Sequence, residues 1–125
     1  MLPAQARLRR RPEFTAVVRS GRRAGRPTLV LHYLSERPVA RVGGPVAPDS
    51  GPRAGFVVGK TVGNSVCRHR VTRQLRHLVA ARLDRLPATA DLVVRARPEA
   101  AGADSTALGR DLDRGLDRLL GARSS

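Results

Sequence analysis

The chain has very little cysteine and few aromatic residues. Its 125 residues include a single cysteine, Cys67, so an internal disulfide is impossible and zinc binding by paired CxxC cysteines is excluded. We expect Cys67 to pack as a small apolar residue. Tryptophan is absent, and the aromatic side chains are Phe14, Tyr33 and Phe56, which limits how many unpaired bases the protein can stack.

Long hydrophobic runs are also absent. No apolar run approaches the roughly 18 residues that a membrane-spanning helix requires, and the N-terminal residues lack the apolar stretch of a secretory signal. We therefore expect a cytoplasmic protein. The length of 125 residues and the 41% hydrophobic content suit one domain, residues 1–125, with a basic arm at 1–11 and a connecting loop rich in proline and glycine at 35–52, to which we assign no function.

Acidic residues are scarce in the first two thirds of the chain. The formal net charge is +14, and from Ala88 to the C-terminus six arginines balance six acidic residues, so the whole excess precedes Ala88. Such one-sided charge favours a polyanionic partner, of which nucleic acid is the commonest. A membrane surface is a weaker alternative, and DNA is weaker too because no helix-turn-helix pairing precedes the basic segment.

The most basic segment is GNSVCRHRVTRQLR at 63–76, and no aspartate or glutamate occurs from Arg53 to Leu83. At about 100° per residue, a helix here separates basic from apolar side chains. The basic side holds His69, Arg70, Arg73, Arg76 and His77, and the apolar side holds Val71, Leu75 and Leu78. A solvated helix face normally interleaves acids with its cations. We therefore predict that this helix, which also carries Arg68, binds RNA phosphates.

The rest of the pattern predicts helices packed on one mixed sheet, an α+β fold. Helices are expected at 12–20, at 63–86 and from Asp104 or Ser105 onward, and strands at 28–34, 53–59 and 91–96. The first two of these strands are expected in the middle of the sheet. These elements give the order αββαβα, and one further short strand is expected in addition around the loop at 35–52.

Enzymatic chemistry by protein side chains finds little support. The sequence GKT at 59–61 lacks the earlier glycine of a P-loop, because residue 54 is alanine, so nucleotide hydrolysis is excluded. Lys60, the one lysine, lies between Gly59 and Gly63, either in a phosphate cradle or in a plain turn between strand and helix.

The three histidines do not form a catalytic arrangement either. None of His32, His69 and His77 has a carboxylate at a spacing that would orient it for acid–base catalysis. The acidic residues are scattered and do not cluster with the histidines. We therefore expect no catalytic residue and no metal site on the protein.

Several features occur in an order that resembles one family. They are Arg7-Leu8, Phe14, the strand ending at Tyr33, the motif KxxGNxVxRxRxxRxxR from Lys60 to Arg76, and VVRARP from Val93 to Pro98. Over nearly the whole chain they resemble the protein subunit of bacterial ribonuclease P. The resemblance implies an α/β sandwich of the ribosomal protein S5 domain 2-like type, with helices packed on one mixed four-stranded sheet.

The resemblance also implies two RNA-binding sets of residues. In that family the arginine-rich helix binds the catalytic RNA, and the first helix and the sheet form a cleft for the 5′ leader of precursor tRNA. The matching catalytic-RNA set is Lys60, Asn64, Arg68, His69, Arg70, Arg73 and Arg76. The matching leader set is Arg7, Arg9, Phe14, Val18 and His32.

Four positions depart from the family's usual residues. His69 replaces the usual asparagine and Thr72 a common lysine, which leaves the arginine spacing intact. Val18 and His32 replace aromatic residues that are frequent in the cleft, and this weakens base stacking there.

The implied function is endonucleolytic removal of the 5′ leader, with catalysis by the RNA and its Mg²⁺ ions. The protein would lower the magnesium requirement, because bound arginines offset the repulsion between leader and catalytic RNA. The alternative is a ribosomal or other structured-RNA-binding module with no role in cleavage, which would share the basic helix and the charge excess. The Gly63-Asn64 turn and the arginine spacing favour ribonuclease P.

Overall fold

A computed structural model describes residues 6–8, 10–36 and 51–121 of the chain. Within them the helices are α1 (Arg11–Ser20), α2 (Ser65–Ala80) and α3 (Ser105–Leu120), and the strands are β1 (Arg22–Gly25), β2 (Leu29–Leu34), β3 (Arg53–Val57) and β4 (Asp91–Ala96). Short 3₁₀ turns, η2 and η3, occupy Leu83–Arg85 and Pro98–Gly102. No helix among the described residues is long and apolar enough to cross a membrane.

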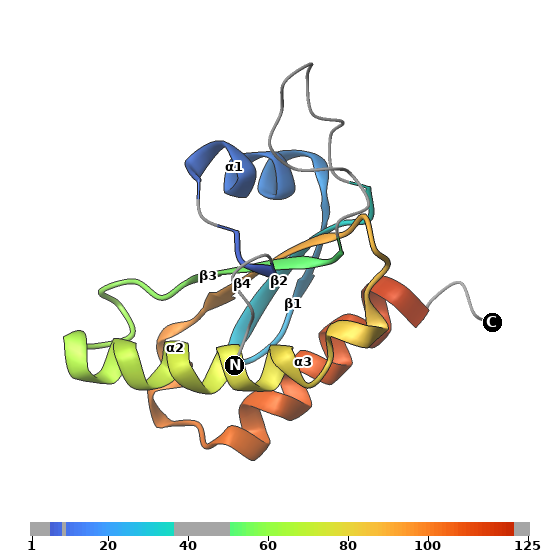
Figure 1. Ribbon diagram of the computed structural model, residues 1–125. Coiled ribbons are helices and arrows are strands. Elements are labelled where there is room, and N and C mark those ends of the chain that lie inside the picture. The colour runs from blue at the N-terminus through green and yellow to red at the C-terminus, as the bar shows by residue number, and fades with distance from the viewer. Residues whose placement is uncertain (1–5, 9, 37–50, 122–125) are drawn as a thin grey trace.

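The four strands form one mixed sheet in the order β1-β2-β4-β3. β2 pairs antiparallel with both β1 and β4, whereas β3 and β4 are parallel. α1 covers one face of this sheet, and α2 and α3 lie side by side on the other (Figure 1). The predicted fold class, helices packed on one mixed four-stranded sheet, is confirmed.

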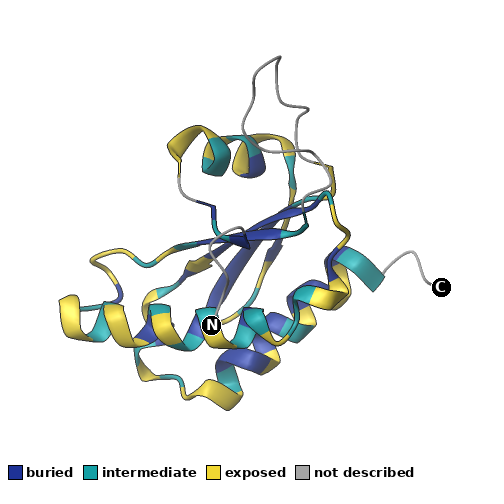
Figure 2. Cartoon of the chain, in the orientation of Figure 1, coloured by how far each residue is buried: buried dark blue, intermediate teal, exposed yellow. Residues whose placement is uncertain are grey.

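The main core lies between the sheet and the α2–α3 layer. Alternate residues of β2 point into it, with Leu29 and Leu31 fully buried and Tyr33 nearly so. The helices contribute Val71, Leu75 and Val79 from α2 and Leu108, Leu112, Leu116 and Leu119 from α3. The sheet and the inner helix surfaces are accordingly buried, while the outer surface of α2 is exposed (Figure 2).

A smaller core fixes α1 to the opposite face. Val17 of α1 is fully buried against Leu8 and Val93, and Phe14 packs beside them. The ring of Phe14 lies directly on β3 at Gly55, where a Cβ would stand 2.5 Å from the ring atoms Cε2 and Cζ. Glycine at position 55 therefore sets how closely α1 approaches the sheet.

The structure corrects the expected places of two strands. The short fourth strand is β1, which precedes β2, and not a strand around the loop at 35–52, most of which lies outside the described residues. Its sequence RRAG gave no strand signal because Ala24 is its one buried residue. β3 lies at the edge of the sheet and not in the middle, but Leu8 N–H donates to the Ala54 carbonyl at 2.9 Å and shields that edge, which explains its apolar sequence.

The basic helix is shorter than expected. It ends at Ala80, and the predicted remainder up to Leu86 is a bend and the η2 turn. The N–H of Arg82 donates to the Val79 carbonyl, a tightened turn that closes the helix. The third buried position of α2 is Val79, whereas Leu78, which the periodicity placed in the apolar stripe, is half-buried.

Candidate RNA-binding surfaces

The Gly63-Asn64 turn starts α2. The Oδ1 atom of Asn64 accepts a hydrogen bond from Cys67 N–H at 2.9 Å, an N-cap that satisfies one of the free amides of the first turn. Gly63 has φ of +154°, and a Cβ there would lie 3.0 Å from the Cβ of Cys67. Both residues therefore have a structural role, and Asn64, although exposed, uses its side-chain oxygen within the protein.

Lys60 lies in the preceding turn, between β3 and α2. Val62 N–H donates to the Gly59 carbonyl at 3.1 Å, and Gly63 N–H donates to the Lys60 carbonyl at 3.2 Å. The segment is thus a turn between strand and helix, which is one of the two interpretations that the sequence allowed. The Lys60 side chain is exposed beside the start of α2, so a contact with RNA phosphate stays a prediction.

The basic side chains of α2 do not share one face. His69, Arg73 and His77 are exposed on its outer side, as is Arg70 on the side nearest η3. Arg70 donates from Nη2 to the Ala101 carbonyl at 2.6 Å, which ties part of its guanidinium to η3. Arg68 and Arg76 are half-buried, and Arg76 lies on the flank nearest β3. The single basic face expected from the periodicity is therefore an outer row plus an inner flank.

Acidic groups do little to neutralise this helix. α2 contains none, and two acids of the neighbouring α3 segment, Asp104 and Asp113, are already engaged. Asp104 caps α3 by accepting from Ala107 N–H at 2.8 Å. Asp113 accepts from Arg82 at 2.6 Å, and this hydrogen bond, with the charges of Arg82 and Arg85, lowers the pKa of Asp113 against the opposing effect of burial. The outer side of α2 is therefore a positively charged surface.

A small hollow at the β3 edge joins the two predicted sets. Its volume is about 110 Å³, and its lining residues include Arg76 and Thr72 from α2 as well as Arg7 and Phe14 from the N-terminal segment and α1. The structure thus brings one member of the catalytic-RNA set next to two members of the leader set. Arg9, another member of the leader set, lies outside the described residues.

The face of the sheet beside α1 carries the remaining leader residues. His32 on β2 is 7% exposed, and Val18 on α1 is 48% exposed. Burial, and then the charges of Arg95 and Arg23, lower the pKa of His32 below its ordinary value of 6.5. At neutral pH the imidazole is therefore uncharged and able to donate one hydrogen bond and accept another.

Sequence reasoning missed Arg23 and Arg95 on this face. Arg23 is directly opposite His32 on β1, while Arg95 on β4 is opposite Val30, one step further along the same face of β2. Both side chains are exposed, and neither forms a hydrogen bond or ion pair with another described residue. The available signal in the sequence was an arginine within an apolar strand. The sequence alone does not show which residue that arginine neighbours, because this depends on how the strands pair.

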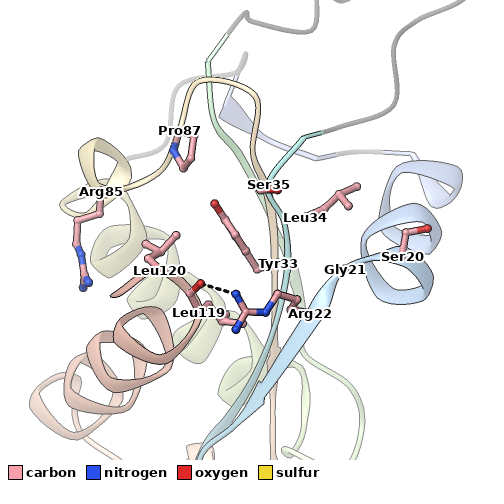
Figure 3. Close-up of a pocket in the computed structure, with 10 residues that line it drawn as sticks. All are labelled: Ser20, Gly21, Arg22, Tyr33, Leu34, Ser35, Arg85, Pro87, Leu119 and Leu120. Carbon is pink, nitrogen blue, oxygen red and sulfur yellow. Dashed lines mark hydrogen bonds between the residues drawn. The ribbon is translucent and has the colours of Figure 1, made fainter. Parts of the chain in front are cut away.

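A larger hollow of about 470 Å³ lies at the other end of the sheet, between the ends of α1, β2 and α3 (Figure 3). Tyr33 points into it, and Arg22 crosses it to donate to the Leu119 carbonyl at 3.0 Å. Its other cation, Arg85, pairs with Asp117 at 2.7 Å. Because its cations are engaged within the protein, we assign this hollow no RNA-binding role.

In the described part of the chain, no three histidine, cysteine, aspartate or glutamate side chains gather where they could hold an ion.

Comparison with known proteins identifies the scaffold. The family model for ribonuclease P matches residues 2–120. The chain belongs to the ribonuclease P protein family. The ribonuclease P protein component of Streptomyces griseus is 54% identical over 121 residues, covering 97% of each chain. That of Corynebacterium diphtheriae is 50% identical over 119 residues, covering 95% of this chain and 97% of its own.

Solved structures of ribonuclease P proteins share the fold. The protein from Staphylococcus aureus superposes with a TM-score of 0.72 at 18% identity, covering 92% of this chain and 97% of its own. The protein from Thermotoga maritima gives 0.68 at 20% identity, covering 90% and 94%. Family membership confirms the predicted function as a protein subunit of this ribonucleoprotein endoribonuclease, and the structured-RNA-binding module without a role in cleavage is not favoured. The individual site residues stay predictions.

Proposed function

We propose that the outer side of α2 binds the catalytic RNA of ribonuclease P and that the face of the sheet beside α1 receives the 5′ leader of precursor tRNA. The observation that supports this most strongly is the hollow at the β3 edge, where Arg76 of α2 lies beside Arg7 and Phe14. Residues from the two predicted RNA-binding sets lie side by side there. The protein would therefore hold the leader against the catalytic RNA.

The α2 surface suits structured RNA because its cations are free of acidic partners. Arg73, His69 and His77 are exposed and form no side-chain hydrogen bond or ion pair with a described residue. Arginine reaches phosphate through charge-assisted and often bidentate hydrogen bonds. Each phosphate neutralised releases counterions, so binding depends strongly on salt.

The leader face suits unpaired RNA of varied sequence. Its cations, Arg23 and Arg95, flank the neutral His32, while Val18 offers an apolar surface in place of an aromatic platform. Phosphate contacts give affinity without selecting a sequence, and the imidazole can hydrogen-bond a base edge. We therefore propose that this protein holds the leader more by its backbone than by base stacking.

Catalysis is assigned to the RNA. We propose that Mg²⁺ is bound by the RNA subunit, because the described side chains do not form a site that fits the ion. The protein's contribution is charge neutralisation. Arginines that offset repulsion between the leader and catalytic RNA reduce the number of Mg²⁺ ions needed for the same purpose. The site of action would be the cytoplasm, where precursor tRNA is processed.

The test is the rate of leader removal from precursor tRNA by the cognate catalytic RNA at low Mg²⁺, with and without the protein. We expect a large increase that requires the RNA and that shrinks as Mg²⁺ is raised. Tight RNA binding without any increase would contradict the proposal. Cleavage by the protein alone would show that its own side chains, the histidines first among them, are catalytic.

A further inference from the structure

Two adjoining hollows form a groove along the exposed seam between α2 and α3. The first, about 370 Å³, lies along α2 and ends at Ser105 of α3, and the second, about 580 Å³, continues along α3. They share Leu78 and Ser105, so we treat them as one α2–α3 groove. Its α3 side includes Arg110 and Arg114, which belong to neither predicted RNA-binding set.

The groove has exposed basic side chains on both sides. Arg73 and His77 come from α2, and Arg110 and Arg114 come from successive turns of α3. All four side chains are exposed, and none forms a hydrogen bond or ion pair with another described residue. The acid in the lining, Asp113, is held by Arg82 at 2.6 Å and 3.1 Å. The groove therefore attracts an anion over its whole length.

The floor of the groove is apolar at Leu78. Leu78 is half-buried there, and a Cβ at Gly109 of α3 would stand 3.3 Å from the Cδ2 atom of Leu78. Cations along the sides and an apolar floor are the combination that a nucleotide requires, since its phosphates are charged and its base has an apolar face. An acidic peptide would form ion pairs with the arginines but would not require an apolar floor.

An amide atom without a partner lies beside the floor. Gln74 of α2 donates from Nε2 to the Oγ atom of Ser105 at 3.1 Å, while its Oε1 atom is shielded from solvent and bonds to no described residue. Because the hydroxyl of Ser105 can donate as well as accept, turning the amide over would leave Nε2 unpaired instead. Buried amide atoms normally have a partner. A base edge at the groove would supply one once the Gln74 side chain turns its amide toward the groove.

We propose that the α2–α3 groove binds one unpaired nucleotide of the catalytic RNA. The base packs on Leu78 with its edge at the Gln74 amide, and the flanking phosphates meet Arg73 on one side and Arg110 and Arg114 on the other. This inference rests on the proposed function, in which α2 meets that RNA. It adds α3 to the interface.

The first test compares the double variant Arg110→Ala/Arg114→Ala with Arg118→Ala, a matched control on the same helix that lines neither hollow. Affinity for the catalytic RNA is measured across a salt series. We expect the double variant to bind roughly 10- to 100-fold more weakly at low salt and to lose about 1.4–1.8 from the slope of log affinity against log salt, the value for two phosphate contacts. Arg118→Ala should match the wild type.

The second test is Gln74→Leu, which removes the amide without changing charge. We expect weaker binding with an unchanged salt slope, and loss of protection of a single unpaired nucleotide in chemical probing of the RNA. If the double variant bound the catalytic RNA with wild-type affinity and salt slope, the groove proposal would be overturned. The same result is expected if the groove binds an acidic protein segment instead of RNA. Failure of the wild-type protein to bind the catalytic RNA would instead overturn the proposed function.

Discussion

Arg53 and Asp91 form a bidentate ion pair across the parallel strands β3 and β4, with Nε to Oδ1 at 2.9 Å and Nη2 to Oδ2 at 2.8 Å. The remaining Arg53 nitrogen, Nη1, donates to Glu13 of α1 at 3.1 Å. The hydrogen bond that Arg53 donates to Asp91 is the largest cause of the raised pKa of Arg53. One guanidinium thus connects the sheet to the helix that lines the leader face.

We predict that Arg53→Met destabilises the protein more than Glu13→Gln does. The first change leaves the Asp91 carboxylate, whose side chain is 2% exposed, without its main counter-ion, at a cost of about 3–5 kcal/mol. Glu13 is more exposed, so its loss should cost about 1 kcal/mol. Unfolding in denaturant measures both. Equal losses would show that the pair does not act as a buried one.

Glycine at position 55 should matter because of Phe14. In Gly55→Ala the new methyl group would meet the Phe14 ring at 2.5 Å and the Cβ of Leu8 at 2.9 Å, so α1 must move. We expect a loss of about 1–3 kcal/mol in stability and weaker binding of the leader, with little change in binding of the catalytic RNA. The affinities for precursor tRNA with and without a leader, measured in the assembled complex, separate these effects.

The control for this change is Gly102→Ala, where a Cβ would meet nothing within 4 Å. It should alter neither stability nor leader binding by a measurable amount. A Gly55→Ala protein that keeps the leader affinity of the wild type would remove Phe14 from the leader site.

Sequence patterns predicted those helices and strands that the local spacing of apolar residues defines. The leucines of α3 repeat every third or fourth residue, and β4 is an apolar run bounded by turns, so the start of α3 and both ends of β4 were predicted correctly. β1 was missed because Ala24 is its one buried residue. Its place in the sheet comes from pairing with β2, which lies beyond any local pattern.

The candidate sites show the same division. The arginine spacing located the α2 surface, but it could not reveal that Arg70 is tied to the Ala101 carbonyl or that Arg76 reaches the β3 edge. Both depend on which neighbours pack against α2. Arg23 and Arg95 became visible as neighbours of His32 once the strand register was known.

Arg70 and Arg73 should behave differently when replaced. Arg73 is exposed and forms no bond with a described residue, so Arg73→Ala should weaken binding of the catalytic RNA about tenfold and leave the melting temperature unchanged. Arg70→Ala should weaken RNA binding too, but it also removes the hydrogen bond to Ala101, which costs up to about 1 kcal/mol of stability. Filter binding and thermal unfolding report the two quantities. A melting temperature lowered equally by both variants would contradict this distinction.

His32 should make leader binding depend on pH. In the free protein, burial and then the charges of Arg95 and Arg23 lower the pKa of His32 below 6.5, so the imidazole is neutral at neutral pH. A leader phosphate between the two arginines would offset their charges and raise that pKa, so binding would take up a proton and leader affinity would increase as pH falls below about 6.5. A recovery of one pKa unit corresponds to about a tenfold gain.

The measurement is the affinity ratio of precursor tRNA with and without its leader, since the ratio cancels any pH dependence in the binding of the catalytic RNA. In His32→Gln the ratio should not change with pH. The lowered pKa also implies that the free wild-type protein loses stability as pH falls below 6.5, because unfolding returns His32 to its ordinary, higher proton affinity. His32→Gln should lack that loss as well. If the ratio has the same pH dependence in both proteins, the protonation of His32 does not respond to the leader. Arg23 and Arg95 would then bind the leader without a contribution from His32.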